Sequence, residues 1–159
     1  MTSQASPART STLVSILPGT TSLSRSVRNV GLALAGSALL ALSAKIQVPF
    51  WPVPMTMQTF AVIVLAMAFG ARLGAATVAL YLLEGAVGLP VFAGTPEKGI
   101  GLAYMMGPTG GYLAGFLVAA GLAGWMAERG WDRSFLKATA VNSLATGVIF
   151  TGGLAWLAV

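Results

Sequence analysis

Apolar runs separated by short polar or glycine- and proline-rich stretches dominate the chain after its first 26 residues. A helix that crosses the hydrocarbon core of a bilayer needs about 20 mainly apolar residues, within a range of about 17 to 25. Five runs approach that length, over residues 27–44, 55–69, 73–89, 111–126 and 135–159. The pattern therefore predicts an all-α integral membrane protein, a compact bundle of five transmembrane helices.

The first 26 residues lack this pattern. Twelve of them are Ser or Thr, none is acidic, and the apolar cluster at residues 13–17 is interrupted by a serine. Such a segment cannot bury enough apolar surface to offset the entropy of ordering it, and its cluster is shorter than the core of a signal peptide, about 7 to 15 residues. We expect residues 1–26 to form a disordered tail and residues 27–159 a transmembrane domain. A misassigned start codon and an interfacial helix are the alternatives for the tail.

Composition supports the membrane assignment and excludes several classes of function. Charged residues make up 8% of the chain, against about a quarter of an ordinary soluble domain. The chain has no Cys and no His, which excludes Cys and His metal sites, cysteine nucleophiles and histidine acid–base pairs. No catalytic set and no phosphate-binding loop emerge. We expect no enzyme activity, no cofactor and no metal, and so few charges offer no face for nucleic acid.

The Lys and Arg residues predict the orientation of the helices. Cytoplasmic loops of membrane proteins carry an excess of these residues. Lys45 follows the first run, and Lys98 lies between the third and fourth runs. These two cations lie on one side of the predicted membrane. The other seven lie on the opposite side of the predicted membrane, and they are Arg9, Arg25, Arg28, Arg72, Arg129, Arg133 and Lys137. We therefore expect a multi-pass protein of a bacterial or archaeal cell membrane, embedded in lipid, with its N-terminus in the cytoplasm.

Two irregular loops then face outward. Residues 47–54 hold three prolines, which fix φ and remove backbone donors, so this loop is extended and stiff. Its aromatic residues Phe50 and Trp51 are interpreted either as interfacial belt residues or as a lid over a pocket. Residues 88–112 include ten Gly or Pro. Because non-helical backbone at membrane depth is tolerated only where protein or a wet cavity satisfies it, this stretch is expected to shape a pocket mouth.

Polar side chains within the apolar runs are candidates for ligand binding. Glu84 near the outer end of the third run either lines an outward cavity or extends to the membrane interface. Gln58 and Thr59 begin the second run, and Asn142 lies early in the fifth. Together these amides and hydroxyls could recognise a neutral polar ligand, although each alone is more often an interhelical hydrogen bond.

Small residues recur at helical spacing along the first run. They are Gly31, Ala33, Ala35, Ser37 and Ala41. In lipid, such faces let helix backbones approach closely, so that dispersion and weak hydrogen bonds hold the helices together. Packing within the chain is the common explanation of this pattern, and a docking face for another membrane subunit is the functional alternative.

Several segments, taken in order, resemble one known family. The run YLLEGAVGLPVFAG at residues 81–94 and the run GPTGGYLAGF at residues 107–116 closely resemble the BioY family, and residues 44–49, 53–59 and 152–157 also look like its pattern. The likeness extends from about residue 27 to the end of the sequence. Members of this family are the substrate-capture, or S, components of energy-coupling-factor biotin transporters.

The resemblance implies a six-helix membrane protein that binds biotin in an outward-opening pocket and carries it inward. It implies that the loop after the first helix is a lid and that small residues on that helix meet a transmembrane coupling subunit, while two cytoplasmic ATPases supply energy. In similar proteins the S component topples in the membrane, and a sixth helix bears an Asp-x-x-Lys pattern. Here the sequence ends at Val159. We expect residues 27–159 to be a substrate-binding domain without its last helix; a site rebuilt around Glu84 is the alternative.

Biotin combines a hydrogen-bonding ureido ring, an apolar body and a carboxylate, so its pocket needs a few polar groups in apolar walls. We expect aromatic walls, side-chain amides and hydroxyls for the ring, backbone amides of residues 107–111, and Lys45 or Lys98 near the carboxylate. The predicted substrate-binding residues are Phe50, Trp51, Gln58, Thr59, Tyr81, Glu84, Phe92, Gly107, Thr109, Gly110, Tyr112 and Asn142. A capture protein for another vitamin and a membrane scaffold without transport are the competing hypotheses.

Overall fold

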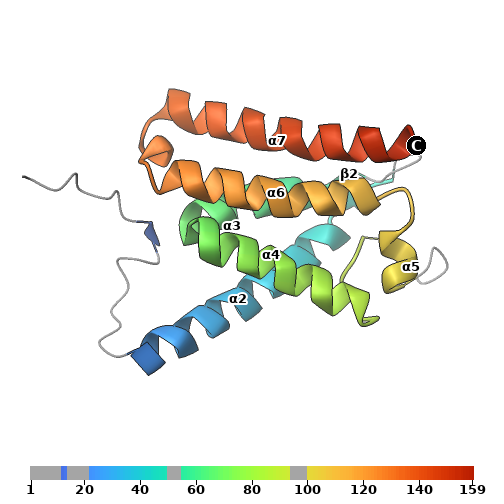
Figure 1. The fold of residues 1–159 in the computed structure, drawn as a ribbon, viewed down its shortest axis with the longest axis horizontal. Coiled ribbons are helices and arrows are strands. Elements are labelled where there is room, and N and C mark those ends of the chain that lie inside the picture. The colour runs from blue at the N-terminus through green and yellow to red at the C-terminus, as the bar shows by residue number, and fades with distance from the viewer. Residues whose placement is uncertain (1–11, 14–21, 50–54, 94–99) are drawn as a thin grey trace, which may run out of the picture.

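The protein is seen in a computed structural model that describes residues 12–13, 22–49, 55–93 and 100–159 (Figure 1). Helices dominate these residues, and a two-stranded antiparallel hairpin joins the first two long helices. The elements in chain order are α2 (Ser22–Lys45), β1 (Gln47–Val48), β2 (Met55–Thr56), α3 (Gln58–Phe69), α4 (Ala71–Ala86), α5 (Leu102–Met105), α6 (Gly110–Ala127), the 3₁₀ turn η2 (Trp131–Arg133) and α7 (Phe135–Leu157).

Each of the five predicted apolar runs contains a helix, although residues 55–56 form β2 and α4 ends before residue 89. The five helices differ in their capacity to cross a membrane. Among the described residues, α2, α6 and α7 are long and apolar enough to span a bilayer. Helix α3 has 12 residues and α4 has 16. Gly70, at φ +86°, separates these two helices. This backbone angle interrupts the helix, and glycine is the residue that adopts it readily. The described part of the chain therefore contains three span candidates, and a count of five remains a prediction.

Helix α2 begins earlier than its apolar run. It starts at Ser22, so residues 22–26 are helical although they were expected in a disordered tail. The helix extends past the apolar boundary because straight-chain and small residues such as Arg25 tolerate helix at its solvated end. The rest of the predicted tail, apart from residues 12–13, lies outside the described residues.

Helix α6 occupies the middle of the assembly. It packs against α7, α3 and α4, while α2 lies across α4 and α3 (Figure 1). Small residues allow the close approach: a Cβ on Gly115 would stand 2.9 Å from the Cα of Ile149 in α7, and one on Gly74 would stand 2.9 Å from the Cα of Ala66. Such separations are shorter than real Cβ contacts, so glycine is required where these helices meet.

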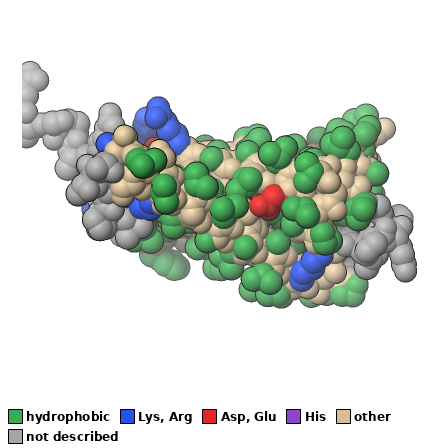
Figure 2. All heavy atoms as spheres, turned by 90° about the horizontal axis from the view of Figure 1, so that it is seen from below, with side chains coloured by type: hydrophobic (Ala, Val, Ile, Leu, Met, Phe, Trp, Pro, Cys, Tyr) green, Lys and Arg blue, Asp and Glu red, His purple; other side chains and the backbone are tan. Residues whose placement is uncertain are grey.

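The turn between α3 and α4 and the turn after α6 lie together at one end of the bundle. Glu128, after α6, accepts a hydrogen bond at 2.9 Å from the backbone nitrogen of Ala71 at the start of α4. The guanidinium of Arg129 lies 3.8 Å from the ring centroid of Trp125, a cation–π contact. Figure 2 shows Lys and Arg side chains gathered mainly at one end of a surface that is otherwise largely apolar.

Candidate functional site

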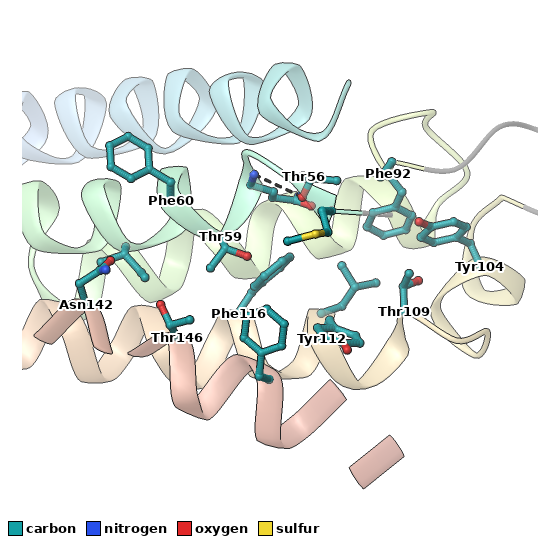
Figure 3. Close-up of a pocket in the computed structure, with 16 residues that line it drawn as sticks. Thr56, Thr59, Phe60, Phe92, Tyr104, Thr109, Tyr112, Phe116, Asn142 and Thr146 are labelled. Carbon is teal, nitrogen blue, oxygen red and sulfur yellow. Dashed lines mark hydrogen bonds between the residues drawn. The ribbon is translucent and has the colours of Figure 1, made fainter. Parts of the chain in front are cut away.

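A cavity of about 350 Å³ opens between α3, α6 and α7 (Figure 3). Its size falls within the range of ligand pockets, about 300 to 1,000 Å³. The hairpin and the segment that follows α4 complete its walls. The lining residues are Met55, Thr56, Gln58, Thr59, Phe60, Ile63, Phe92, Ala93, Tyr104, Thr109, Tyr112, Leu113, Phe116, Asn142, Thr146 and Phe150.

Helical periodicity explains why these side chains share one cavity. Residues three, four and seven positions apart lie on the same face of a helix. On α6 this spacing joins Thr109, Tyr112 and Phe116, and on α7 a spacing of four joins Asn142 to Thr146. Each helix therefore contributes one stripe of side chains to the cavity.

Six of the sixteen residues that line the cavity are aromatic. The rings of Phe92 and Tyr104 stack with centroids 5.0 Å apart and planes 15° apart. Across the cavity, Tyr112 meets Phe150 edge to face at 5.9 Å. Packed aromatic pairs of this kind hold their side chains in fixed positions, so this wall is formed before any ligand arrives.

Two polar atoms of the wall lack a hydrogen bond. The amide nitrogen Nε2 of Gln58 and the hydroxyl Oγ1 of Thr109 are both buried, and neither has a hydrogen-bond partner within the described residues. The Tyr81 hydroxyl lies near the Gln58 amide. It donates its own proton to the carbonyl of Val91 at 3.0 Å, and its oxygen can still accept from a neighbour. Since a buried polar group without a partner costs roughly 1–3 kcal/mol, these two atoms are suited to bind a polar ligand.

Half of the predicted substrate-binding residues line this cavity. They come from α3, α6, α7 and the segment after α4, which are distant in the sequence and adjacent in Figure 3. The residues brought together are Gln58, Thr59, Phe92, Thr109, Tyr112 and Asn142. Phe50, Trp51 and Lys98 lie outside the described residues, so the predicted aromatic lid remains a prediction.

Tyr81 and Glu84 do not line the cavity, which corrects the prediction for both. Tyr81 is fully buried behind the wall, where its ring meets the edge of Phe92 at 5.5 Å. Glu84 lies on the side of α4 that faces α2, and its carboxylate accepts a hydrogen bond from Ser37 at 3.1 Å. Successive residues of a helix point about 100° apart, so Glu84 is turned away from the face on which its neighbour Gly85 meets the Phe92 ring.

The glycines at the start of α6 serve packing instead of ligand binding. The backbone nitrogen of Gly110 donates to the carbonyl of Gly107 at 3.1 Å, so this amide is already used. The same carbonyl accepts a hydrogen bond at 3.0 Å from the indole of Trp156. A Cβ on Gly110 would overlap the carbonyl of Met105. These contacts join the start of α6 to the end of α7, and they correct the prediction that Gly107 and Gly110 present free amides.

The small residues of α2 divide between two faces. Gly31 and Ala35 are exposed, and Ala33 and Ala41 are half-buried. Ser37 is 2% exposed and donates to Glu84 within the chain. It therefore belongs to the α2–α4 contact, which corrects its assignment to a docking face, whereas the Gly31–Ala35 pair remains on the surface.

Sequence reasoning missed several apolar members of the wall. Tyr104, Leu113, Phe116 and Phe150 line the cavity, but they are indistinguishable in type from residues that face other helices. Helical spacing could have identified one of them, because Phe116 lies four residues after Tyr112 and therefore on the same face of the helix. No comparable spacing pointed to Tyr104, which lies on the four-residue helix α5.

Comparison with known proteins relates this fold to one group of transporters. The chain is 42% identical over 118 residues to a protein of Thermotoga maritima named biotin transporter BioY. This alignment covers 74% of this chain and 67% of that protein. It is 40% identical over 97 residues to a probable biotin transporter BioY of Pyrococcus horikoshii, covering 61% of this chain and 58% of that protein. The chain thus spans about three fifths to two thirds of the length of these relatives.

A solved structure has the same fold. The crystal structure of the S-component for biotin from an ECF-type ABC transporter superposes with a TM-score of 0.73 and 23% sequence identity, covering 87% of this chain and 75% of that one. The model of the BioY family matches residues 11–159, which includes every element that lines the cavity. This chain therefore belongs to the BioY family.

Proposed function

We propose that this chain captures biotin in the cavity between α3, α6 and α7 as the S component of a biotin uptake system. Relatives in two organisms are named biotin transporters, and the fold is that of an S component. In this proposal the chain binds the vitamin, and a separate module supplies the energy, since the sequence has no phosphate-binding loop of its own.

The observation that carries the proposal is the pair of buried, unpaired polar atoms on Gln58 and Thr109 within an aromatic cavity. The ureido ring of biotin offers both donors and an acceptor, and its bicyclic body is apolar. Gln58 can donate through Nε2 to the ureido oxygen, and Thr109 can accept from a ureido N–H. The apolar body then fits between rings such as Phe92 and Tyr112.

In the membrane, we propose that α3 and α4 join the three long helices to give five crossings, with the N-terminus in the cytoplasm. Helix α3 of 12 residues is about 18 Å long and α4 of 16 residues about 24 Å. Both are shorter than the hydrocarbon core of about 30 Å, so each crossing would include residues that flank the helix. Cations at the α3–α4 and α6–α7 turns support the orientation, since Lys and Arg concentrate on the cytoplasmic side.

The exposed Gly31–Ala35 pair of α2 is the proposed contact with a transmembrane coupling subunit. A surface without large side chains lets another helix approach closely in lipid. A Cβ on Gly31 would meet nothing within 4 Å, so this position is open. The cytoplasmic ATPases would act through that subunit.

Biotin binding by the purified chain in lipid nanodiscs tests the proposal. We expect saturable binding, and we expect Gln58→Met and Thr109→Val each to weaken it about tenfold, or ~1.4 kcal/mol, because each removes a hydrogen bond to the ligand. Thr139→Val is the matched control, since the Thr139 hydroxyl bonds to its own helix at the carbonyl of Phe135. Absence of binding by the unaltered chain, or unchanged binding by both variants, would contradict the proposal, and competition by riboflavin or thiamine would point to another vitamin.

A further inference from the structure

Side chains from two helices hold the irregular segment that follows α4. The hydroxyl of Tyr81 in α4 donates to the carbonyl of Val91 at 3.0 Å. The ammonium of Lys45 in α2 donates to the next carbonyl, that of Phe92, at 2.8 Å. Backbone carbonyls outside regular structure need partners where water is scarce, so these two side chains fix adjacent peptide groups.

Lys45 is placed to link two walls of the cavity. It is the last residue of α2, where a positive charge complements the helix dipole. The hairpin begins two residues later, and its second strand, Met55–Thr56, lines the cavity. The hydrogen bond from Lys45 therefore ties the base of that hairpin to the segment bearing Phe92 on the other wall.

The position of Phe92 depends on a closely fitted niche. Its side chain is 5% exposed and stacks on Tyr104. A Cβ on Gly85 would overlap the Phe92 ring, so the ring lies directly on the backbone of α4. Because the ring and the carbonyl held by Lys45 belong to one residue, a loosened carbonyl lets the ring leave this niche.

We propose that Lys45 is a positioning residue for the cavity: its ammonium holds the Phe92 carbonyl and thereby fixes the Phe92 ring as a wall of the ligand site. The proposal rests on the proposed function, that the cavity binds biotin. It differs from a direct ion pair between Lys45 and the biotin carboxylate, because here the ammonium acts on a backbone oxygen of the wall and not on the ligand. A lost wall contact lets a bound ligand leave sooner.

The dissociation rate of biotin in nanodiscs is the measurement. We expect Lys45→Met, which keeps the length of the side chain but not its donors, to raise that rate about fivefold, the effect of one lost hydrogen bond. Lys45→Arg retains donors and is expected to restore most of the slow release. Lys137→Met, in the first turn of α7, is the matched control. Lys45→Leu, which also lacks donors, provides a second measurement should the methionine variant not fold.

Biotinamide, which lacks the carboxylate, separates positioning from direct binding. If Lys45 positions Phe92, Lys45→Met accelerates the release of biotin and of biotinamide by the same factor. An effect on biotin alone would overturn the proposal in favour of an ion pair with the carboxylate. An unchanged release of both ligands would overturn it as well.

Hydrogen exchange in the ligand-free protein distinguishes failure of this inference from failure of the proposed function. We expect Lys45→Met to speed exchange of the amides of Val91, Phe92 and Ala93 by severalfold relative to Lys137→Met. Faster exchange with no biotin binding by the unaltered chain would uphold the role of Lys45 and contradict biotin capture. Unchanged exchange, with normal biotin binding, would contradict the role of Lys45 alone.

Discussion

Gly85 has no side chain, and this allows the Phe92 ring to pack directly against the backbone of α4. The Phe92 ring lies on the backbone of α4 at this point, and the ring lines the cavity. Gly85→Ala would force the ring toward the cavity, because the three atoms nearest to an added Cβ all belong to the Phe92 ring. We expect biotin affinity to fall at least tenfold, as in other overpacked sites that cost about 1–3 kcal/mol, in a titration in nanodiscs.

Gly147→Ala is the control for this change. A Cβ at Gly147 of α7 would meet nothing within 4 Å, and alanine favours helix over glycine by up to about 1 kcal/mol. We expect this variant to bind biotin normally and to be at least as thermally stable as the unaltered chain. Equal biotin affinity in both variants would show that the Phe92 ring does not depend on the Gly85 niche.

At the scale of single residues, the sequence predicted which polar side chains lie in the apolar runs better than it predicted the direction in which each side chain points. Gln58, Thr59 and Asn142 were recognisable as polar groups in apolar runs, and all three line the cavity. Glu84 had the same appearance in the sequence, but it faces α2. One step along a helix turns a side chain by about 100°, and uniformly apolar helices give no amphipathic pattern from which to read the inward face.

At the scale of elements, glycines determine how closely α6 approaches α7. A Cβ on Gly115 would stand 2.9 Å from the Cα of Ile149, so Gly115→Leu must separate the two helices. We expect the midpoint of thermal unfolding to fall by roughly 5 °C, since overpacking costs about 1–3 kcal/mol. Because Tyr112 of α6 and Asn142 of α7 face the same cavity, the separation should also weaken biotin binding.

Gly121→Leu provides the comparison on the same helix. A Cβ at Gly121 would meet nothing within 4 Å, so the added side chain has room. We expect its unfolding midpoint to stay within about 2 °C of the unaltered chain. A Gly115→Leu protein as stable as Gly121→Leu would contradict the close packing of α6 on α7.

The positions of the helices followed from apolar length more closely than the helix ends did. The runs at residues 55–69 and 73–89 were each expected to be helical throughout, but Gly70 ends α3 at 12 residues and Gly88, at φ +102°, follows the end of α4. Both glycines lie within or beside apolar sequence. Hydropathy averages over such a residue, while the backbone turns there, so the boundary was invisible to a count of apolar residues.

At the scale of the whole molecule, orientation is the property that links the cavity to transport. Thr109 and Tyr112, at the start of α6, line the cavity, and the cations Arg129 and Arg133 follow the end of that helix. Helix α6 has 18 residues and is therefore about 27 Å long, close to the hydrocarbon thickness of a bilayer. A helix that crosses the membrane has its two ends on opposite sides, so one labelled position at each end of this span candidate tests the orientation.

Because the chain has no cysteine, two single-cysteine variants, Met106→Cys and Ser134→Cys, report that orientation without background. Met106, before α6, is 77% exposed, and Ser134, after η2, caps α7 without a side-chain hydrogen bond, so both substitutions should be tolerated. In intact cells we expect a membrane-impermeant maleimide to label Met106→Cys at least tenfold faster than Ser134→Cys, with permeabilisation making the two rates similar, since excess Lys and Arg mark the cytoplasmic side. The reverse order would place the N-terminus and the Arg-bearing turns outside, and the cavity would then face the cytoplasm, where it could not capture a vitamin from the medium.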